Sequence, residues 1–364
     1  MKSVLKSSIL LAATAIAFAS CSKNDTTSAN TTSTATSSIN FDDISVSSCS
    51  SETGIDHVVC LADAFKAQLN ATQLAAVQLD YSITDAKKWS NFPEAIYGQR
   101  VGLNFGSMTS TQIKYALVLI KAISGTTKNE GWDEIVQLLC ADEYLKANGG
   151  GSDYGYANYY IAFLGTPAAT DTFEIQFGGH HLAFANTYEN GVLAGATPSF
   201  RGVEPFSTFT WKNKSCQPLQ QEQAALSAML TGLSSTQLAT AKLSGTYSDL
   251  IAGPQRDDAF PSTPSGIACS ELTSAQKTLV LNAIKTYVGD IADANDIITK
   301  YTNELDDTYI SYSGTTGVTT KNDYVRIDGP SVWIEYSVQN GVVLSGTHPH
   351  SVWRDKNTDY GGNL

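Results

Sequence analysis

The chain has 364 residues, of which 42% are hydrophobic and 16% charged, a composition typical of a globular protein of one or two domains. Acidic residues outnumber Lys and Arg by 35 to 23, which gives a formal net charge of −12. This balance and the lack of any run of Lys or Arg argue against nucleic acid as a partner and against a basic membrane-binding patch.

The first 20 residues have the pattern of a secretory signal peptide, in which Lys2 and Lys6 precede an apolar run from Ile9 to Ala19. That run is shorter than the about 20 apolar residues that a membrane-spanning helix needs. It ends in "FASC", which resembles a bacterial lipobox. We therefore expect lipidation of Cys21 and a lipoprotein anchored by its acyl chains to a membrane of the cell envelope, periplasmic or at the cell surface. Simple secretion is the alternative.

Residues 21–48 begin, after Cys21, with "SKNDTTSANTTSTATSSIN", a stretch rich in Ser, Thr and Asn and nearly free of large apolar side chains, so it cannot repay the entropy of ordering. We expect this segment to be a flexible tether between the anchor and a single globular domain at residues 49–364.

Cysteine spacing suggests disulfides, which form in an oxidising compartment. Cys49 and Cys60 flank a short polar segment and are the first predicted pair, while Cys216 and Cys269 are a second candidate pair. Cys140 lies in the apolar helical stretch "EIVQLLC" and is expected to be a buried thiol.

Four segments carry a capping box, in which an N-cap side chain and a Gln three residues later each bond the other's backbone N–H. The pairs are Asn70 with Gln73, Thr109 with Gln112, Ser234 with Gln237, and Thr273 with Gln276. Asn70 and Thr109 lie 39 residues apart, and so do Ser234 and Thr273. The second pair is offset from the first by 164 residues. This spacing predicts an internally duplicated helix-loop-helix unit, with chance recurrence of a common motif as the alternative.

Other apolar runs at helical spacing predict helices at 57–68, 131–147 and 217–231. Strand-like alternation occurs in "TFEIQF", "HLAFANTY", "GVLAGATP", "YVRID", "SVWIEYSV" and "GVVLSGT", with Asn-Gly hairpin signals at 190–191 and 340–341. Because helices and hairpins segregate along the chain, we expect an α+β fold in which capped helices pack against antiparallel hairpins.

Histidine clustering gives the candidate site. His180 and His181 follow two glycines; on a strand such neighbours point to opposite faces, so one of them could face a shared site. His348 and His350 flank Pro349 and would project to one face of an extended strand. Together these residues predict a histidine-lined metal site from two distant hairpins that would suit zinc or copper.

Charged residues near the last histidines complete a hypothetical metal-dependent hydrolase. Asp359 could be a further metal ligand, Glu335 or Asp355 a general base, and Arg354 a stabiliser of developing negative charge. One alternative is a non-catalytic envelope lipoprotein that binds a glycan or a protein on a surface rich in tyrosine, such as "DYGYANYY" and "YISY". A purely structural role for the histidines and for "WRD" is the other.

Several motifs in order resemble the domain of unknown function 3500 (DUF3500) family: "WSNFP", "RVGL", "GHHLAF", "TPSFRGVEP", "DGPSVWIEY", "HPHSVWRD" and "DYG". The resemblance implies no established activity. It does imply that the family's signature positions are those of His180, His181, His348, His350, Arg354, Asp355 and Asp359. The chain departs from the family pattern at Pro349 and Lys356.

Overall fold

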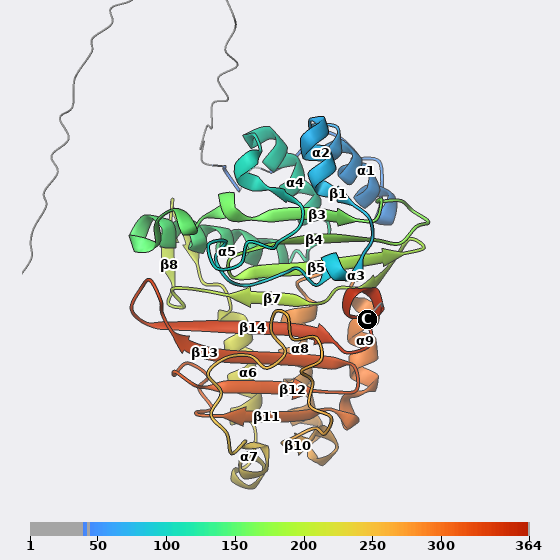
Figure 1. The fold of residues 1–364 in the computed structure, drawn as a ribbon. Coiled ribbons are helices and arrows are strands. Elements are labelled where there is room, and N and C mark those ends of the chain that lie inside the picture. The colour runs from blue at the N-terminus through green and yellow to red at the C-terminus, as the bar shows by residue number, and fades with distance from the viewer. Residues whose placement is uncertain (1–38, 42–43, 363–364) are drawn as a thin grey trace, which may run out of the picture. The chain divides into compact units, whose positions relative to one another are not determined.

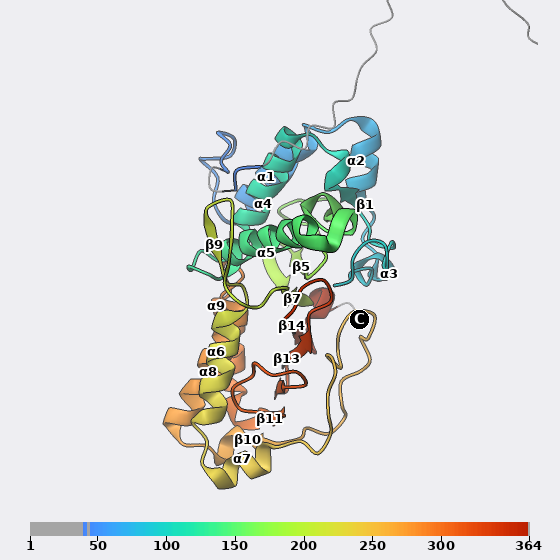
Figure 2. The same cartoon turned by 90° about the vertical axis from the view of Figure 1, so that its left-hand side faces the viewer.

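The structure is a computed structural model, and it describes residues 39–41 and 44–362 (Figures 1 and 2). The predicted signal peptide, Cys21 and the tether up to residue 38 lie outside the described residues. Within the described part of the chain, no helix is both long enough and apolar enough to span a bilayer.

A 12-stranded sheet forms the centre of the fold, in the order β1-β3-β4-β5-β7-β14-β13-β12-β11-β10, with β2 paired to β3 and β6 to β5 (Figure 1). The strands before the middle of this order are β1 (Gln78–Leu79), β2 (Leu103–Asn104), β3 (Tyr160–Leu164), β4 (Phe173–Gly179), β5 (Leu182–Glu189), β6 (Val192–Gly195) and β7 (Ser199–Gly202). Those after it are β10 (Ile267–Ala268), β11 (Tyr309–Ser313), β12 (Tyr324–Asp328), β13 (Val332–Asn340) and β14 (Thr347–Asp355). A separate ribbon consists of β8 (Phe209–Trp211) and β9 (Lys214–Cys216).

The two halves of the sheet meet where β7 pairs with β14. This pairing is antiparallel and sets Gly202 opposite His350 and Arg201 opposite Ser351. Of the pairings between the named strands, only that of β1 with β3 is parallel. The antiparallel sheet with segregated helices confirms the predicted α+β class.

Helices cover mainly one face of this sheet, as the side view shows (Figure 2). They are α1 (Gly54–Lys66), α2 (Ala71–Val77), α3 (Ile83–Ala86), α4 (Ser110–Ala122), α5 (Gly131–Leu145), α6 (Gln220–Thr231), α7 (Ser235–Ala241), α8 (Ser274–Val288) and α9 (Asn295–Asn303). The main apolar core lies between these helices and the sheet. A smaller core on the other face joins Phe200 and Val352 to Trp89, Leu250 and Tyr360, beneath the loops around 87–101 and 245–263.

Every predicted capping box is present, so all four predicted helix starts are confirmed. The contacts around them also recur. Gln73 Nε2 donates to Gln112 Oε1 over 3.2 Å, and Gln237 Nε2 donates to Gln276 Oε1 over the same distance. Strands β2 and β10 pair in the same register with β3 and β11. Such recurrence is what an internal duplication predicts, and the duplication itself stays a prediction.

The last hairpin differs from its prediction. "GVVLSGT" was expected to be a strand, but residues 341–346 form a loop and β14 takes up the polar run that follows. The loop is held by Glu204, whose carboxylate accepts from the backbone N–H of Val343 over 2.8 Å. Because β14 pairs on both sides, its polar residues are buried in the middle of the sheet.

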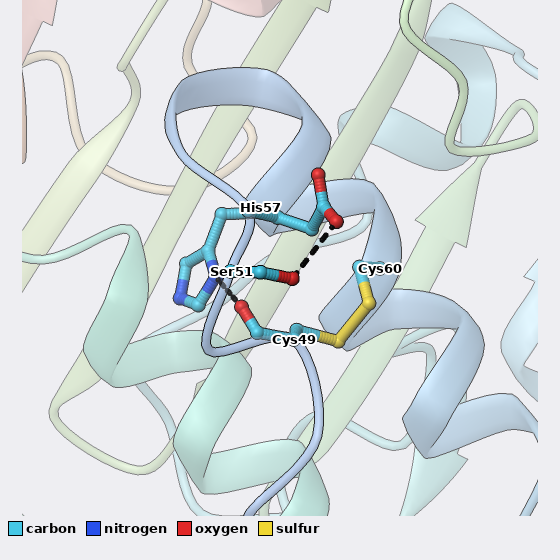
Figure 3. The surroundings of a disulfide bond; sticks show 5 residues. Cys49, Ser51, His57 and Cys60 are labelled. Carbon is cyan, nitrogen blue, oxygen red and sulfur yellow. Dashed lines mark hydrogen bonds between the residues drawn. A yellow bond between two sulfur atoms is a disulfide. The ribbon is translucent and has the colours of Figure 1, made fainter.

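The Cys49–Cys60 disulfide is confirmed and ties the segment before α1 to that helix, with His57 Nδ1 2.9 Å from the carbonyl of Cys49 (Figure 3). The second candidate pair is wrong: Cys216 and Cys269 form no disulfide. Cys216 lies on β9 beside α5, whereas Cys269 follows β10 at the far end of the other half of the sheet.

Part of the predicted tether packs onto the folded body. Ile44 is buried in the main core, and the ring of Phe41 meets that of Tyr156 edge-on. The apolar residues Ile39, Phe41, Ile44 and Val46 interrupt the Ser/Thr-rich composition, and their burial explains why packing begins before residue 49.

Glu174 on β4 provides a test of the core's response to pH. It is fully buried, with the hydroxyl of Thr187 donating to its carboxylate over 3.0 Å, and burial raises its pKa to about 7. The folded state therefore keeps a proton that the unfolded chain has lost above about pH 4.5, so stability falls as the pH rises from about 4.5 to 7. We expect Glu174→Gln to remove up to about 3 kcal/mol of this pH dependence, measured by urea unfolding at several pH values. Parallel stability curves for wild type and variant would contradict the assignment.

Candidate metal centre

His180 and His181 form the two-residue turn between β4 and β5, rather than part of a strand. His181 has φ of 61°, in the left-handed region that residues other than glycine seldom occupy. Gly179 and Leu182 pair immediately beside the turn, which fixes the positions of both rings.

His348 and His350 lie two residues apart on β14 and so project from one face, as their spacing predicted. They oppose Gln339 and Ser337 on β13, and His350 also opposes Gly202 on β7. Pro349 is accommodated between them within the strand.

Three histidines converge although the turn and β14 lie far apart in sequence. His181, His348 and His350 are all buried, and one nitrogen from each lies within 4.8 Å of the others. The closest pair is His181 Nε2 and His348 Nε2, at 2.7 Å. Among the described residues, the buried Nε2 of His350 has no hydrogen-bond partner.

Outer hydrogen bonds orient the ring of His350, whereas His348, among the described residues, has only a longer contact with a carboxylate. His350 Nδ1 lies 3.0 Å from Asp249 Oδ1 and 2.8 Å from the amide of Gln339. The Asp249 carboxylate only accepts and so requires the proton on Nδ1, whereas the Gln339 contact is through its amide nitrogen Nε2, which donates. A proton on Nδ1, with the Gln339 amide turned so that Oε1 faces the ring, leaves a lone pair on the buried Nε2 of His350. His348 Nδ1 lies 3.7 Å from the buried carboxylate of Glu204. Carboxylates behind imidazoles are the usual outer partners of metal-binding histidines.

Burial favours the neutral form of two of the rings, those of His181 and His348. It lowers the pKa of His181 well below its ordinary value, and the three neighbouring imidazoles lower it further. Burial also lowers the pKa of His348 to about 2. For Asp249, burial raises the pKa, but the contacts with His350, the backbone N–H of Leu250 and the amide of Gln339 together outweigh burial, and the pKa is lower than usual. Neutral imidazole is the form that donates a lone pair to a metal.

A tetrahedral ion with bonds of about 2.0–2.1 Å to nitrogen holds two ligand nitrogens about 3.3 Å apart. The 2.7 Å contact of His181 with His348 would therefore have to open by about 0.6 Å, and the nitrogen of His350 lies within 4.8 Å of the other two. The three nitrogens are thus close enough to hold a single transition-metal ion after side-chain adjustment.

His180 is not part of the three-histidine cluster. Its Nδ1 lies 2.6 Å from Asp142 Oδ1 on α5, and its carbonyl accepts from the hydroxyl of Tyr159. Its ring stacks on that of His181 with centroids 3.6 Å apart. His180 therefore holds the ring of His181 in place from behind.

Glu335, expected as a general base, forms hydrogen bonds away from the histidines instead. It lies on the same face of the sheet as His350, but its two oxygens accept from Ile251 N, Ala252 N, Tyr324 Oη and Trp333 Nε1. Burial raises its pKa. With four donors on one carboxylate, Glu335 fixes the covering loop to the sheet.

Arg354, Asp355 and Asp359 are also kept from the histidines. Arg354 lies about 13 Å along β14 from His350 and is fully buried. Its Nε donates to Asp359 over 2.7 Å, and another guanidinium nitrogen donates to Asp257 over 2.7 Å. Asp355 accepts from the hydroxyl of Tyr301 over 2.7 Å and pairs with Lys300. These residues tie the chain end to the sheet, as the structural alternative for "WRD" holds.

Sequence patterns missed the outer partners of the histidines: Asp142, Glu204, Asp249 and Gln339. Glu204 could have been identified from the sequence, since it lies in the "TPSFRGVEP" motif. Asp142 and Asp249 precede their histidines by 38 and 101 residues, and no local pattern marks them.

The tyrosine clusters do not line a common surface. Tyr159 and Tyr312 are buried, and Tyr154 packs edge-on against the ring of His180. These three tyrosines contribute to packing around the sheet and the histidines.

A family model described as "Protein of unknown function (DUF3500)" matches residues 51–362. The chain belongs to the DUF3500 family. No curated protein and no solved structure matches it. The DUF3500 match includes the histidine turn, β7 and the whole of β14, so the cluster lies within the family domain.

Gly202 provides a test of the cluster's packing. A Cβ at this position would lie 2.9 Å from His350 Cδ2 and 3.0 Å from His181 Cδ2, closer than carbon atoms approach. We expect Gly202→Ala to displace both rings and to lower stability by about 1–3 kcal/mol in urea unfolding. Gly98→Ala is the control, because its nearest such contact is 3.8 Å at an exposed position. Equal stabilities of the two variants would show that the rings are not packed as described.

Proposed function

We propose that this DUF3500 member is a metal-binding lipoprotein of the cell envelope in which His181, His348 and His350 hold one zinc or copper ion. The observation that carries the proposal is the convergence of three buried imidazoles, two of which, His348 and His350, each have a buried nitrogen lacking a hydrogen-bond partner among the described residues. A buried acceptor left without a partner costs about 1–3 kcal/mol, and a metal bond would offset that cost.

The donor set supports a transition metal. Imidazole nitrogen suits zinc and copper, whereas calcium and magnesium prefer oxygen. His180 with Asp142 behind His181, and Asp249 behind His350, supply the outer contacts that keep such ligands in position.

Hydrolysis is the finer part of the proposal. Three protein ligands leave the fourth position of a tetrahedral ion open, and zinc there supplies Lewis-acid chemistry by lowering the pKa of bound water toward about 7. The Asp249 side chain is 46% exposed, so the side of His350 is where a substrate could approach. Glu335, Asp355 and Arg354 take no part in this proposal, because their contacts commit them elsewhere.

The envelope location rests on the sequence. The predicted leader, Cys21 and the Ser/Thr-rich segment after it are the features of an anchored lipoprotein. The Cys49–Cys60 disulfide supports an oxidising compartment.

Metal analysis of the purified protein tests the centre directly. We expect about one equivalent of zinc or copper in wild type after loading and desalting, and a loss of at least tenfold in affinity in His350→Ala, because one of three ligands is gone. His57→Ala is the matched control, since His57 lies on α1 and its ring nitrogen Nδ1 bonds to the Cys49 carbonyl, away from the three-histidine cluster. Metal content that is absent in wild type, or equal in wild type and His350→Ala, would refute the centre.

A panel of p-nitrophenyl esters and phosphates tests hydrolysis separately. We expect the zinc-loaded protein to release nitrophenol from at least one of them, and we expect a chelator or His350→Ala to abolish the release. Stoichiometric metal without any turnover would retain the metal centre and reject the hydrolase.

A further inference from the structure

A second group of buried charges lies on the helix-covered face of the sheet, around Arg201 on β7. Glu134 lies on α5, and Glu130 is the residue immediately before that helix. Asp290 follows the end of α8. Glu222 on α6 is the fourth carboxyl. Side chains alternate along β7, so Arg201 faces away from the histidines that Gly202 adjoins. This carboxylate cluster is therefore separate from the histidine cluster.

Arg201 balances only part of the charge. Its Nε lies 2.7 Å from Glu134, and its second contact is with Asp290 at 3.0 Å. The same two carboxylates also accept hydrogen bonds from the backbone. The N–H of Leu219 donates to Glu134 over 2.8 Å, and that of Gly131 donates to Asp290 over 2.6 Å. When ionised, four carboxylates against one guanidinium leave three negative charges in a buried site.

Glu222 is the residue that lacks compensation. Its side chain is 1% exposed, and neither of its oxygens has a hydrogen-bond donor among the described residues. Glu130 Oε2 is likewise buried without a donor, and the two carboxyls face each other. Two acceptors in contact need a proton or a cation between them, because ionised carboxylates only repel.

We infer that Glu130, Glu134 and Asp290, with Glu222 beside them, form a second cation site that takes a hard divalent ion such as Ca²⁺ or Mn²⁺. One carboxylate oxygen from each of the first three lies within 4.8 Å of the others. An ion with bonds of 2.3–2.6 Å can join oxygens up to about 5 Å apart. Oxygen ligands alone select calcium, manganese or magnesium over zinc, so the two sites differ in the metal they prefer.

A surface cleft passes close to this site, although none of the four carboxyl residues lines it. A cleft lined by Gly125, Val288, Gly289 and Ile291 adjoins Asp290, which lies between two of these residues in sequence. The ion would join the start of α5 to α6 and to the end of α8, and so link the first half of the chain to the second. Its role would be to stabilise the contact between the halves.

Calorimetric titration and thermal unfolding of the full chain test the inference. The protein is treated with a chelator in the His350→Ala background, so that the histidine centre does not contribute. We expect Ca²⁺ or Mn²⁺ to bind with one-to-one stoichiometry and to raise Tm. We expect Glu222→Gln to weaken binding by at least tenfold and to raise Tm without metal, because it removes an uncompensated buried charge. Glu271→Gln, at an exposed position, is the matched control and should change neither.

Two results would overturn the inference. One is that none of Ca²⁺, Mn²⁺ and Mg²⁺ binds, or that Glu222→Gln binds as wild type does. The other is that lowering the pH from 8 to 5 stabilises the metal-free protein while every cation is without effect. Burial and the neighbouring carboxylates raise the pKa of Glu130 to about 9, so this second result would show that protons neutralise the cluster. If Glu222→Gln does not fold, Glu130→Gln replaces it, because Glu130 Oε2 also lacks a donor.

Discussion

The antiparallel pairing of β7 with β14 is the contact on which the rest of the structure depends. It joins a sheet half made by β3, β4 and β5 to one made by β11, β12 and β13 (Figure 1). Without this pairing, His350 would have no partner on β7. The turn at His181, which is joined to β7 through β5, would then lie in a different sheet from His350. The pairing also places Gly202 where the lack of a side chain leaves room for two imidazoles.

Alternation along this pair separates two kinds of chemistry. Gly202 and His350 point to the face that carries nitrogen donors, whereas Arg201, one residue earlier, points to the face that carries carboxylates. A one-residue change in register would exchange these faces and place the guanidinium among neutral imidazoles. The register of β7 against β14 is therefore a constraint on both clusters at once.

The sequence predicted what depends on local signals. Capping boxes identified four helix starts because the paired side chains lie three residues apart, and Cys49 and Cys60 were near enough to suggest their bridge. His348 and His350 could be placed on one face from a spacing of two. It failed where tertiary contacts decide: "GVVLSGT" has strand composition, yet Glu204 holds Val343 in a loop. Arg354 and Asp359 are close in sequence to the histidines, but they bond to each other instead of facing the cluster.

In the described part of the chain, the buried histidines do not have hydrogen-bond partners for all of their ring nitrogens. Metal binding therefore explains the cluster better than packing alone. A core imidazole usually has hydrogen-bond partners for both of its nitrogens. Here one contact joins two imidazole nitrogens, and another nitrogen, His350 Nε2, has no partner among the described residues. The rings are nonetheless held by a left-handed turn, a stacked neighbour and several carboxylates. Elements that hold three imidazole nitrogens close together, at a cost to the isolated fold, are what a preorganised metal site requires.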